Sequence, residues 1–355
     1  MSESTEGKHK KLFYRMLFLL CFAVLFFVSG YYTRRAVYRS RAQNLDRSGA
    51  QMFNQIREEA FVQDKYKYIN PLLTCELSEL RIAPELSLLK DKISAVIDAH
   101  LKSGDVQKIS IYFDTRDGRW LGINMNEKYF PASLLKIPTM IAFLKKAEID
   151  TTLLQKKIVY KGDFDFNKQE YFKPSKVLEP QKFYTVDELL ERMIVESDNN
   201  ALALLYQNID EKDLMEVYTD LGLSIPEKKN EYMTDFMSVK SYANFFRVLY
   251  NASYLSRNMS EKALEWLTQS NFSLGLRAGV PEGVIIAKKF GERDFSGTNN
   301  LNSPKELHDC GVVYVPSRPY LLCVMTKGTD YEKLAGVIKD VSSFIYKEME
   351  RIVKK

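Results

Sequence analysis

The segment Pro131-Ala-Ser-Leu-Leu-Lys136 places a hydroxyl and an amine three residues apart, at the point where an apolar run begins. Residues i and i+3 share one face of a helix, so we expect the side chains of Ser133 and Lys136 to meet. A lysine that loses its proton readily in a desolvated pocket can activate a serine hydroxyl as a nucleophile. A serine at a helix start also lies among unpaired backbone N–H groups, which can bind an oxyanion. Alone, the pattern is more typical of a first-turn serine followed by a solvated lysine.

The composition excludes several classes of protein. The chain has 355 residues, 45% of them hydrophobic and 27% charged, as in ordinary globular proteins, and it suggests one large domain or two small ones. The net charge of +5 is spread along the chain, so we expect no nucleic-acid partner. Three histidines offer little material for a Ser-His-Asp triad or a metal site, and the cysteines show no C-x-x-C spacing. We therefore expect neither a metal nor a cofactor. The cysteines also reveal no disulfide framework, and they leave the redox compartment open: Cys21, Cys75, Cys310 and Cys323.

The amino-terminal region has the pattern of a membrane anchor. Residues 1–12 form a short polar N-terminus, and Met16 to Val28 is an unbroken apolar run. With its neighbours this run predicts a transmembrane helix over residues 13–32, because a spanning helix needs about 20 residues. The alternative is a cleaved signal peptide. We favour an anchor, since no A-x-A-type site follows the run and Arg34 and Arg35 come directly after it.

Residues 33–84 are rich in charged and amide side chains and predict a juxtamembrane stalk, and residues 85–355 predict the folded domain. Its first part shows a helical apolar period over residues 85–101, followed by strand-like alternation from Ile109. Asp117-Gly118 is a turn signal, so residues 109–123 are expected to form a hairpin.

The middle of the domain is predicted to be mostly helical. The helix that carries Lys136 contains Pro138, which we expect to kink it or to remove a hydrogen bond. Residues 150–180 are expected to be irregular. Thr185-Val-Asp-Glu188 is a capping box that opens a further helix. Ser197-Asp-Asn199 then lies at a junction between two helices, where a cluster of N-capping residues is the ordinary interpretation.

The carboxyl-terminal part mixes helices and strands. Helices are expected over residues 238–250 and after a cap at Ser260. Three strands are expected next, the first from Gly283 to a cationic turn at Gly291 and the others over residues 310–315 and 320–326, with a long helix at the end. These strands and the earlier hairpin predict an α+β domain with one five-stranded antiparallel sheet.

Three motifs occur in a fixed order: Ser133-Leu-Leu-Lys136, Ser197-Asp-Asn199 and Lys289-Phe-Gly291. In this order the chain resembles the class A β-lactamase and penicillin-binding-protein superfamily over residues from about 85 to 355. The resemblance implies a β-lactamase/transpeptidase-like fold, in which the five-stranded sheet is flanked by helices and joined by a helical subdomain.

The resemblance also implies a role for each motif. Ser133 would attack a carbonyl and form an acyl-enzyme, with Lys136 as its base. Ser197 would relay a proton to the leaving nitrogen. Asn199 would contact the substrate amide, and Lys289 would hold the substrate carboxylate.

The oxyanion would be held by the backbone N–H groups of Ser133 and Glu292, the residue after Gly291. The third motif departs from the family pattern K-T-G or K-S-G, because Phe290 has no hydroxyl. Arg293 is our candidate to replace that hydroxyl on the substrate carboxylate.

A second departure concerns deacylation. Class A β-lactamases carry a loop glutamate that activates the hydrolytic water. Here the corresponding segment, residues 223–234, has no E-x-x-L-N pattern, and its only carboxylates are Glu227 and Glu231. We therefore expect acylation to be supported better than deacylation.

Three functions follow from these patterns. The first is a membrane-anchored serine hydrolase that acts on β-lactams or on a peptidoglycan stem peptide. The second is a D-Ala-D-Ala carboxypeptidase or penicillin-binding protein with slow deacylation. The third is a non-catalytic sensor that binds β-lactams or cell-wall peptides. Since this chemistry has a use only outside the inner membrane, we expect residues 36–355 to be extracytoplasmic.

Overall fold

A computed structural model describes residues 66–71, 84–115, 119–223, 234–295, 303–316 and 318–353. The predicted anchor over residues 13–32, most of the stalk and the Asp117-Gly118 turn lie outside the described residues. Among the residues that are described, no helix combines the length and apolarity of a membrane span. The chain divides into two compact units, Met1–Lys65 and Tyr66–Lys355, and every element below belongs to the second.

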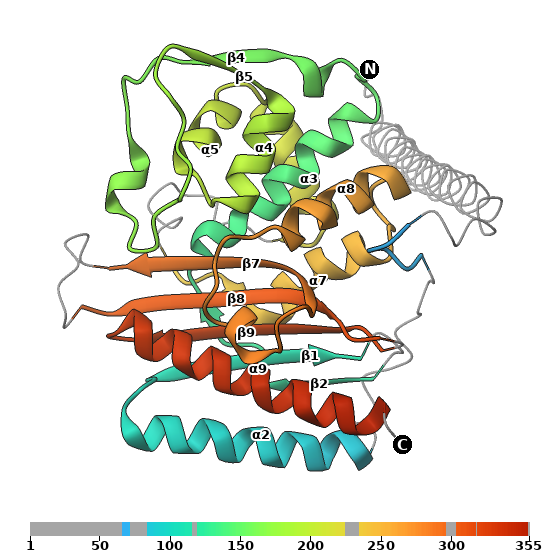
Figure 1. Cartoon of the computed structure of the whole chain (residues 1–355), viewed down its shortest axis with the longest axis vertical. Coiled ribbons are helices and arrows are strands. Elements are labelled where there is room, and N and C mark those ends of the chain that lie inside the picture. The colour runs from blue at the N-terminus through green and yellow to red at the C-terminus, as the bar shows by residue number, and fades with distance from the viewer. Residues whose placement is uncertain are drawn as a thin grey trace, which may run out of the picture. The chain divides into compact units, whose positions relative to one another are not determined.

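A single antiparallel sheet of five strands forms the centre of this unit (Figure 1), and its strand order is β2-β1-β9-β8-β7. The α+β fold and the predicted hairpin are confirmed. Because β7 lies at one edge, the Lys289-Phe-Gly291 motif is on an edge strand. The strands are β1 (Lys108–Asp114), β2 (Trp120–Ile123), β7 (Ile285–Asp294), β8 (Lys305–Tyr314) and β9 (Tyr320–Gly328).

Two long helices, α2 (Pro84–Ser103) and α9 (Tyr331–Val353), cover one face of the sheet (Figure 1). Strand residues alternate between faces, so Ile111 and Phe113 pack with these helices. Tyr112 between them belongs to the second core, on the other face. Apolar residues along α9 are buried in the core that α2 and α9 form with the sheet: Leu334, Val337, Ile338, Val341 and Ile345.

The second core joins the sheet to the helical subdomain, as the resemblance implied. Two small two-stranded antiparallel sheets complete this part: β3 (Lys128–Tyr129) pairs with β6 (Met237–Ser238), and β4 (Lys157–Tyr160) pairs with β5 (Lys182–Thr185). The helices are α3 (Lys136–Ala147), α4 (Val186–Val195), α5 (Asn199–Tyr206), α6 (Glu211–Asp220), α7 (Val239–Tyr250) and α8 (Arg257–Thr268).

Four local predictions are corrected by these elements. Residues 150–180 are not wholly irregular, because β4 lies within them. Ser256 caps α8, whereas Ser260 is buried one turn inside it. Pro138 lies in the first turn of α3, where a missing N–H removes no intrahelical bond. Finally, β7 does not end in a turn at Gly291 but continues to Asp294, since β8 pairs with it over its whole length.

Candidate active site

Ser133 lies in a short 3₁₀ turn, Ala132–Leu135, which leads directly into α3 at Lys136. Ala132 has a φ of 49°, a left-handed conformation that is unfavourable for a residue with a Cβ. Strand β7 passes close beneath this turn. A Cβ on Gly291 would lie 3.0 Å from the Pro131 carbonyl oxygen and 3.1 Å from the Leu134 nitrogen. The glycine of the third motif therefore allows the edge strand to approach the nucleophile turn.

Lys136 is almost fully buried, at 1% exposure, and its ammonium group points toward the second motif. Its Nζ donates to the carbonyl oxygen of Ser197 at 2.6 Å, to Ser197 Oγ at 3.0 Å and to Asn199 Oδ1 at 2.6 Å. Within the described residues Lys136 makes no hydrogen bond to Ser133, the expected partner at i−3. Burial lowers the pKa of Lys136 to about 8, against a smaller opposing effect of nearby carboxylates. A large fraction of this lysine is therefore neutral near pH 8 and able to accept a proton.

Ser197 occupies the junction between α4 and α5 with a φ of 58°. Its Oγ accepts from Lys136 Nζ at 3.0 Å and from Lys289 Nζ at 2.8 Å. A hydroxyl has two acceptor positions and one donor hydrogen. Both acceptor positions face a lysine, so the hydroxyl hydrogen remains available for donation to a third group.

Asp198 explains why the second motif is held at this junction. Its Oδ1 accepts from the backbone nitrogens of Asn200 at 2.8 Å and Ala201 at 3.2 Å, which makes it the N-cap of α5. Asn167 Nδ2 donates to the same oxygen at 2.8 Å. The capping interpretation is confirmed, because the aspartate caps the helix, and its two neighbours contact Lys136. The catalytic roles of Ser197 and Asn199 stay predictions.

Lys289 lies on β7 and is fully buried. Besides Ser197, it donates to the carbonyl oxygen of Phe290 at 3.1 Å. Burial, followed by the neighbouring cations Lys136 and Lys288, lowers the pKa of Lys289 well below its ordinary value. The two site lysines therefore disfavour each other's charge across one hydroxyl group.

The sequence interpretation missed a second carboxyl group at the site, Glu170. Asn199 Nδ2 donates to Glu170 Oε1, and the Glu170 carboxyl group is also hydrogen-bonded to the carboxyl group of Glu292. The Glu292 side chain accepts from the backbone nitrogens of Tyr171 at 2.8 Å and Phe172 at 3.1 Å. Burial and the contact with Glu170 raise the pKa of Glu292 to about 9, so Glu292 holds a proton at neutral pH. Glu170 lies in the segment predicted as irregular, and no periodicity marks it.

The departure at Phe290 has a structural explanation, and Arg293 lies on the same strand. Phe290 stacks on Phe272 with ring centroids 4.1 Å apart, and Phe172 meets its edge at 6.1 Å. It therefore packs into an aromatic cluster that anchors the segment carrying Glu170. The guanidinium of Arg293 lies 3.7 Å from the centroid of the Phe130 ring. Whether it reaches a substrate carboxylate stays a prediction, as does the role of the Glu292 backbone N–H.

The structure thus brings Lys136, Ser197, Asn199 and Lys289 into one hydrogen-bonded group, one turn from Ser133. Such a group can take a proton from a nucleophile and deliver one to a leaving atom. Among the described residues, no three His, Cys, Asp or Glu side chains are grouped so that they could hold a metal ion. Segment 224–233, with Glu227 and Glu231, lies outside them.

Known proteins share this fold. The chain is 26% identical to a β-lactamase of Streptomyces fradiae over 241 residues, which is 63% of this chain and 75% of the relative. It superposes on the class A β-lactamase from Mycobacterium abscessus with a TM-score of 0.60, at 20% identity, covering 73% of this chain and 98% of that one. The acyl-enzyme complex of a PBP-A mutant with penicillin G matches with a TM-score of 0.60, at 20% identity, covering 74% of this chain and 97% of that one.

These likenesses agree with the order of the three motifs and with the five-stranded sheet. The model of the β-lactamase enzyme family matches residues 88–349, which contain the whole group around Ser133. This chain belongs to the β-lactamase enzyme family and has the fold of a class A β-lactamase-like serine hydrolase.

Proposed function

We propose that this protein forms an acyl-enzyme on Ser133 with a β-lactam or a peptidoglycan-type amide. The observation that carries the proposal is the buried group in which Lys136 and Lys289 both donate to the hydroxyl of Ser197. A buried lysine with a lowered pKa has a cost for folding, and such costs are typical of sites that move protons. The β-lactamase relative and the penicillin complex of PBP-A support the choice of substrate class.

The reaction begins when Ser133 Oγ attacks the carbonyl carbon and its proton passes to the neutral Nζ of Lys136. The negative charge on the carbonyl oxygen is stabilised by the backbone N–H groups of Ser133 and Glu292. The carbon–nitrogen bond then breaks, and the leaving nitrogen takes the hydroxyl proton of Ser197. Lys136 returns its proton to Ser197, which leaves an ester on Ser133 and a neutral lysine. Lys289 holds the substrate carboxylate.

Deacylation is expected to be slow, which favours the penicillin-binding-protein variant of this function. A hydrolytic water needs a proton acceptor. Of the two carboxyl groups found at the site, Glu292 holds a proton, and Glu170 is engaged by Asn199 and by Glu292 itself. We therefore propose an acyl-enzyme that persists well beyond the time needed to form it.

Intact-mass measurements on the full chain, incubated with penicillin G, separate the three functions. An adduct that forms and persists supports the penicillin-binding-protein function, and one that forms and clears supports a β-lactamase. Absence of any covalent adduct, with retained non-covalent binding, would refute both enzymes in favour of a sensor. Ser133→Ala is the control and should remove the adduct.

We also propose that residues 13–32 anchor the protein in a membrane, with residues 36–355 on the extracytoplasmic side. The proposal rests on the apolar run in the sequence and on the need to meet cell-wall substrates. Added protease should digest the domain in cells whose outer layers are opened while the inner membrane stays sealed. Complete protection of the domain until that membrane is lysed would refute the orientation.

A further inference from the structure

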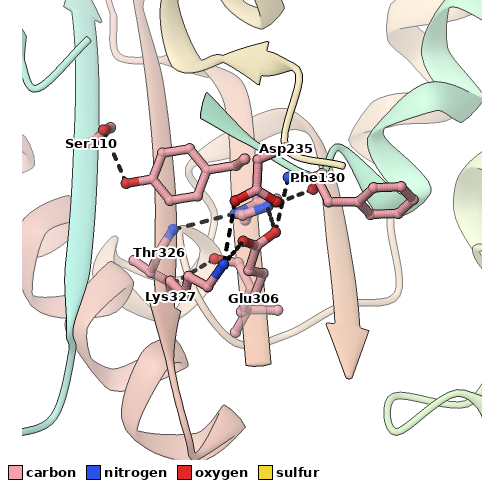
Figure 2. A network of polar contacts seen from close by, with 9 residues as sticks. Ser110, Phe130, Asp235, Glu306, Thr326 and Lys327 are labelled. Carbon is pink, nitrogen blue, oxygen red and sulfur yellow. Dashed lines mark hydrogen bonds and ion pairs between the residues drawn. The ribbon is translucent and has the colours of Figure 1, made fainter. Parts of the chain in front are cut away.

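Phe130, three residues before Ser133, is held at both of its backbone polar groups by side chains of β8. Its N–H donates to Glu306 Oε2 at 3.0 Å (Figure 2), and its carbonyl oxygen accepts from His308 Nε2 at 3.0 Å. Glu306 and His308 are two residues apart on β8, so their side chains lie on one face of the sheet. Both are fully buried. The backbone of Phe130 is therefore hydrogen-bonded to two side chains of β8, an interior strand of the sheet.

The network around these two residues fixes their hydrogen-bonding roles. The Thr326 N–H donates to His308 Nδ1 at 3.3 Å, which leaves Nε2 as the ring nitrogen that donates to Phe130. Glu306 Oε1 pairs with Lys327 Nζ at 3.1 Å, and the same ammonium pairs with Asp235 at 3.3 Å (Figure 2). Burial raises the pKa of Glu306, but His308 and Lys327 outweigh it and hold that pKa below its ordinary value. Glu306 is thus an ionised acceptor at neutral pH.

The turn that follows Phe130 needs such support. Ala132 holds a left-handed φ of 49°, and strained residues persist only where the surrounding structure determines them strongly. Two further contacts fix Tyr129, the residue before Phe130. The Phe236 N–H donates to the Tyr129 carbonyl oxygen at 3.1 Å, and the Tyr129 hydroxyl lies 3.0 Å from Ser110 Oγ. The polar groups of Phe130 are the last anchored to the sheet before the strained residue.

We infer that Glu306 and His308 are positioning residues, which clamp the backbone of Phe130 and thereby set Ser133 in place for acylation. The inference rests on the proposed role of Ser133 as nucleophile. A charge-assisted bond to an N–H is stronger than a neutral one, so Glu306 carries the larger share. A misplacement of about 1 Å at a reacting atom can cost roughly 100-fold in rate.

The test compares apolar and conservative variants of the clamp in the full chain with penicillin G. In Glu306→Leu and His308→Leu we expect the maximal acylation rate to fall about 100-fold, with a much smaller change in the concentration for half-maximal rate. Glu306→Gln keeps an acceptor oxygen, and His308→Gln keeps a donor nitrogen. Both should recover acylation to within about tenfold of the wild type, since most of the geometry is restored.

A matched control is Glu261→Leu. Glu261 also accepts from backbone N–H groups, those of Lys67, Tyr68 and Ile69, but it lies on α8 and contacts no member of the clamp. Its loss should lower the melting temperature without changing the acylation rate of the folded protein. Equal rate losses in Glu261→Leu and Glu306→Leu would overturn the inference, because they would indicate a general loss of stability.

Hydrogen exchange tests the clamp without using activity. In the wild type the amide of Phe130 should exchange slowly, and in Glu306→Gln it should exchange at least about tenfold faster, because a neutral acceptor binds it less strongly. Unchanged exchange at Phe130, or wild-type acylation in a folded Glu306→Leu, would overturn the inference. If the Phe130 amide of the wild type exchanges slowly but Ser133 forms no adduct, the proposed function is refuted and the clamp is not.

Discussion

Two neighbouring lysines on β7 are both buried, yet their surroundings differ. Lys288 donates to Asp309 Oδ2 at 3.1 Å, and the same carboxylate oxygen accepts from the Leu276 N–H at 2.9 Å. Lys289 faces the other side of the strand, where its partners are the hydroxyl of Ser197 and the carbonyl oxygen of Phe290. One lysine is paired with a carboxylate, whereas the hydrogen-bond partners of the other among the described residues are neutral oxygens.

The pKa values follow this difference. Burial lowers the pKa of Lys288, and the attraction of Asp309 opposes it. At Lys289 burial acts together with the repulsion of Lys136 and Lys288. A lysine paired with a buried carboxylate contributes to the fold, whereas Lys289 directs its ammonium group at the second motif. The comparison therefore separates a lysine with a structural role from one that faces the proposed site.

The largest effect is expected from Lys136→Met, on the site side of the comparison. Removing a positioned base costs about 10²–10⁴-fold in rate, so we expect acylation of Ser133 by penicillin G to slow by about 10³-fold. Stopped-flow measurement with a fluorescent penicillin gives the rate, and circular dichroism checks the fold. A folded variant that acylates at the wild-type rate would contradict the assignment of Lys136 as base.

Lys288→Met should lower the stability of the protein and leave its acylation rate almost unchanged. It leaves Asp309 buried without its cation, which destabilises a protein by about 3–5 kcal/mol. The acylation rate of the folded fraction should stay within a few-fold of the wild type. Urea unfolding measures the stability, and the double variant Lys288→Met, Asp309→Leu should recover much of the loss. A stable Lys288→Met that cannot be acylated would remove the distinction between the two lysines.

A smaller effect is expected from Glu292→Gln. The folded-state pKa of Glu292 is raised to about 9, so the wild type loses stability as the pH rises from the ordinary pKa of 4.5 toward 9. The uncharged variant keeps acceptors for Tyr171 and Phe172 and lacks this loss. Its melting temperature should exceed that of the wild type at pH 8 by clearly more than at pH 5, because each pH unit between the two pKa values is worth about 1.4 kcal/mol. Calorimetry at pH 5 and pH 8 tests this, and parallel pH dependences would refute the raised pKa.

The order of motifs and the apolar periods were sufficient to predict most of the fold. Strand alternation at Ile109, Ile111 and Phe113 and the helical period of α9 depend on short spacings that a sequence displays directly. The group formed by Lys136, Ser197, Asn199 and Lys289 became predictable once three separate motifs occurred in one order. Its hydrogen bonds nevertheless join residues up to 92 positions apart, which no local pattern specifies.

Other features depend on contacts that a sequence does not display. Glu170 resembles any solvated loop carboxylate until Asn199 and Glu292 are seen beside it. Ser256 and Ser260 are equally good caps by composition, and packing decides between them by burying Ser260. No local pattern marks the role of His308, because its hydrogen bond to Phe130 depends on the pairing of β8 with β7 and β9.

The central claim is that a neutral Lys136 activates Ser133, and the pH dependence of acylation tests it most directly. Since burial lowers the pKa of Lys136 to about 8, only the form above that pH accepts the proton of Ser133. We predict that the rate of adduct formation on Ser133 rises about tenfold per pH unit below pH 8 and levels off above it, as a single ionisation requires. A rate that is flat from pH 5.5 to pH 9.5, or an adduct that persists in Ser133→Ala, would contradict the account.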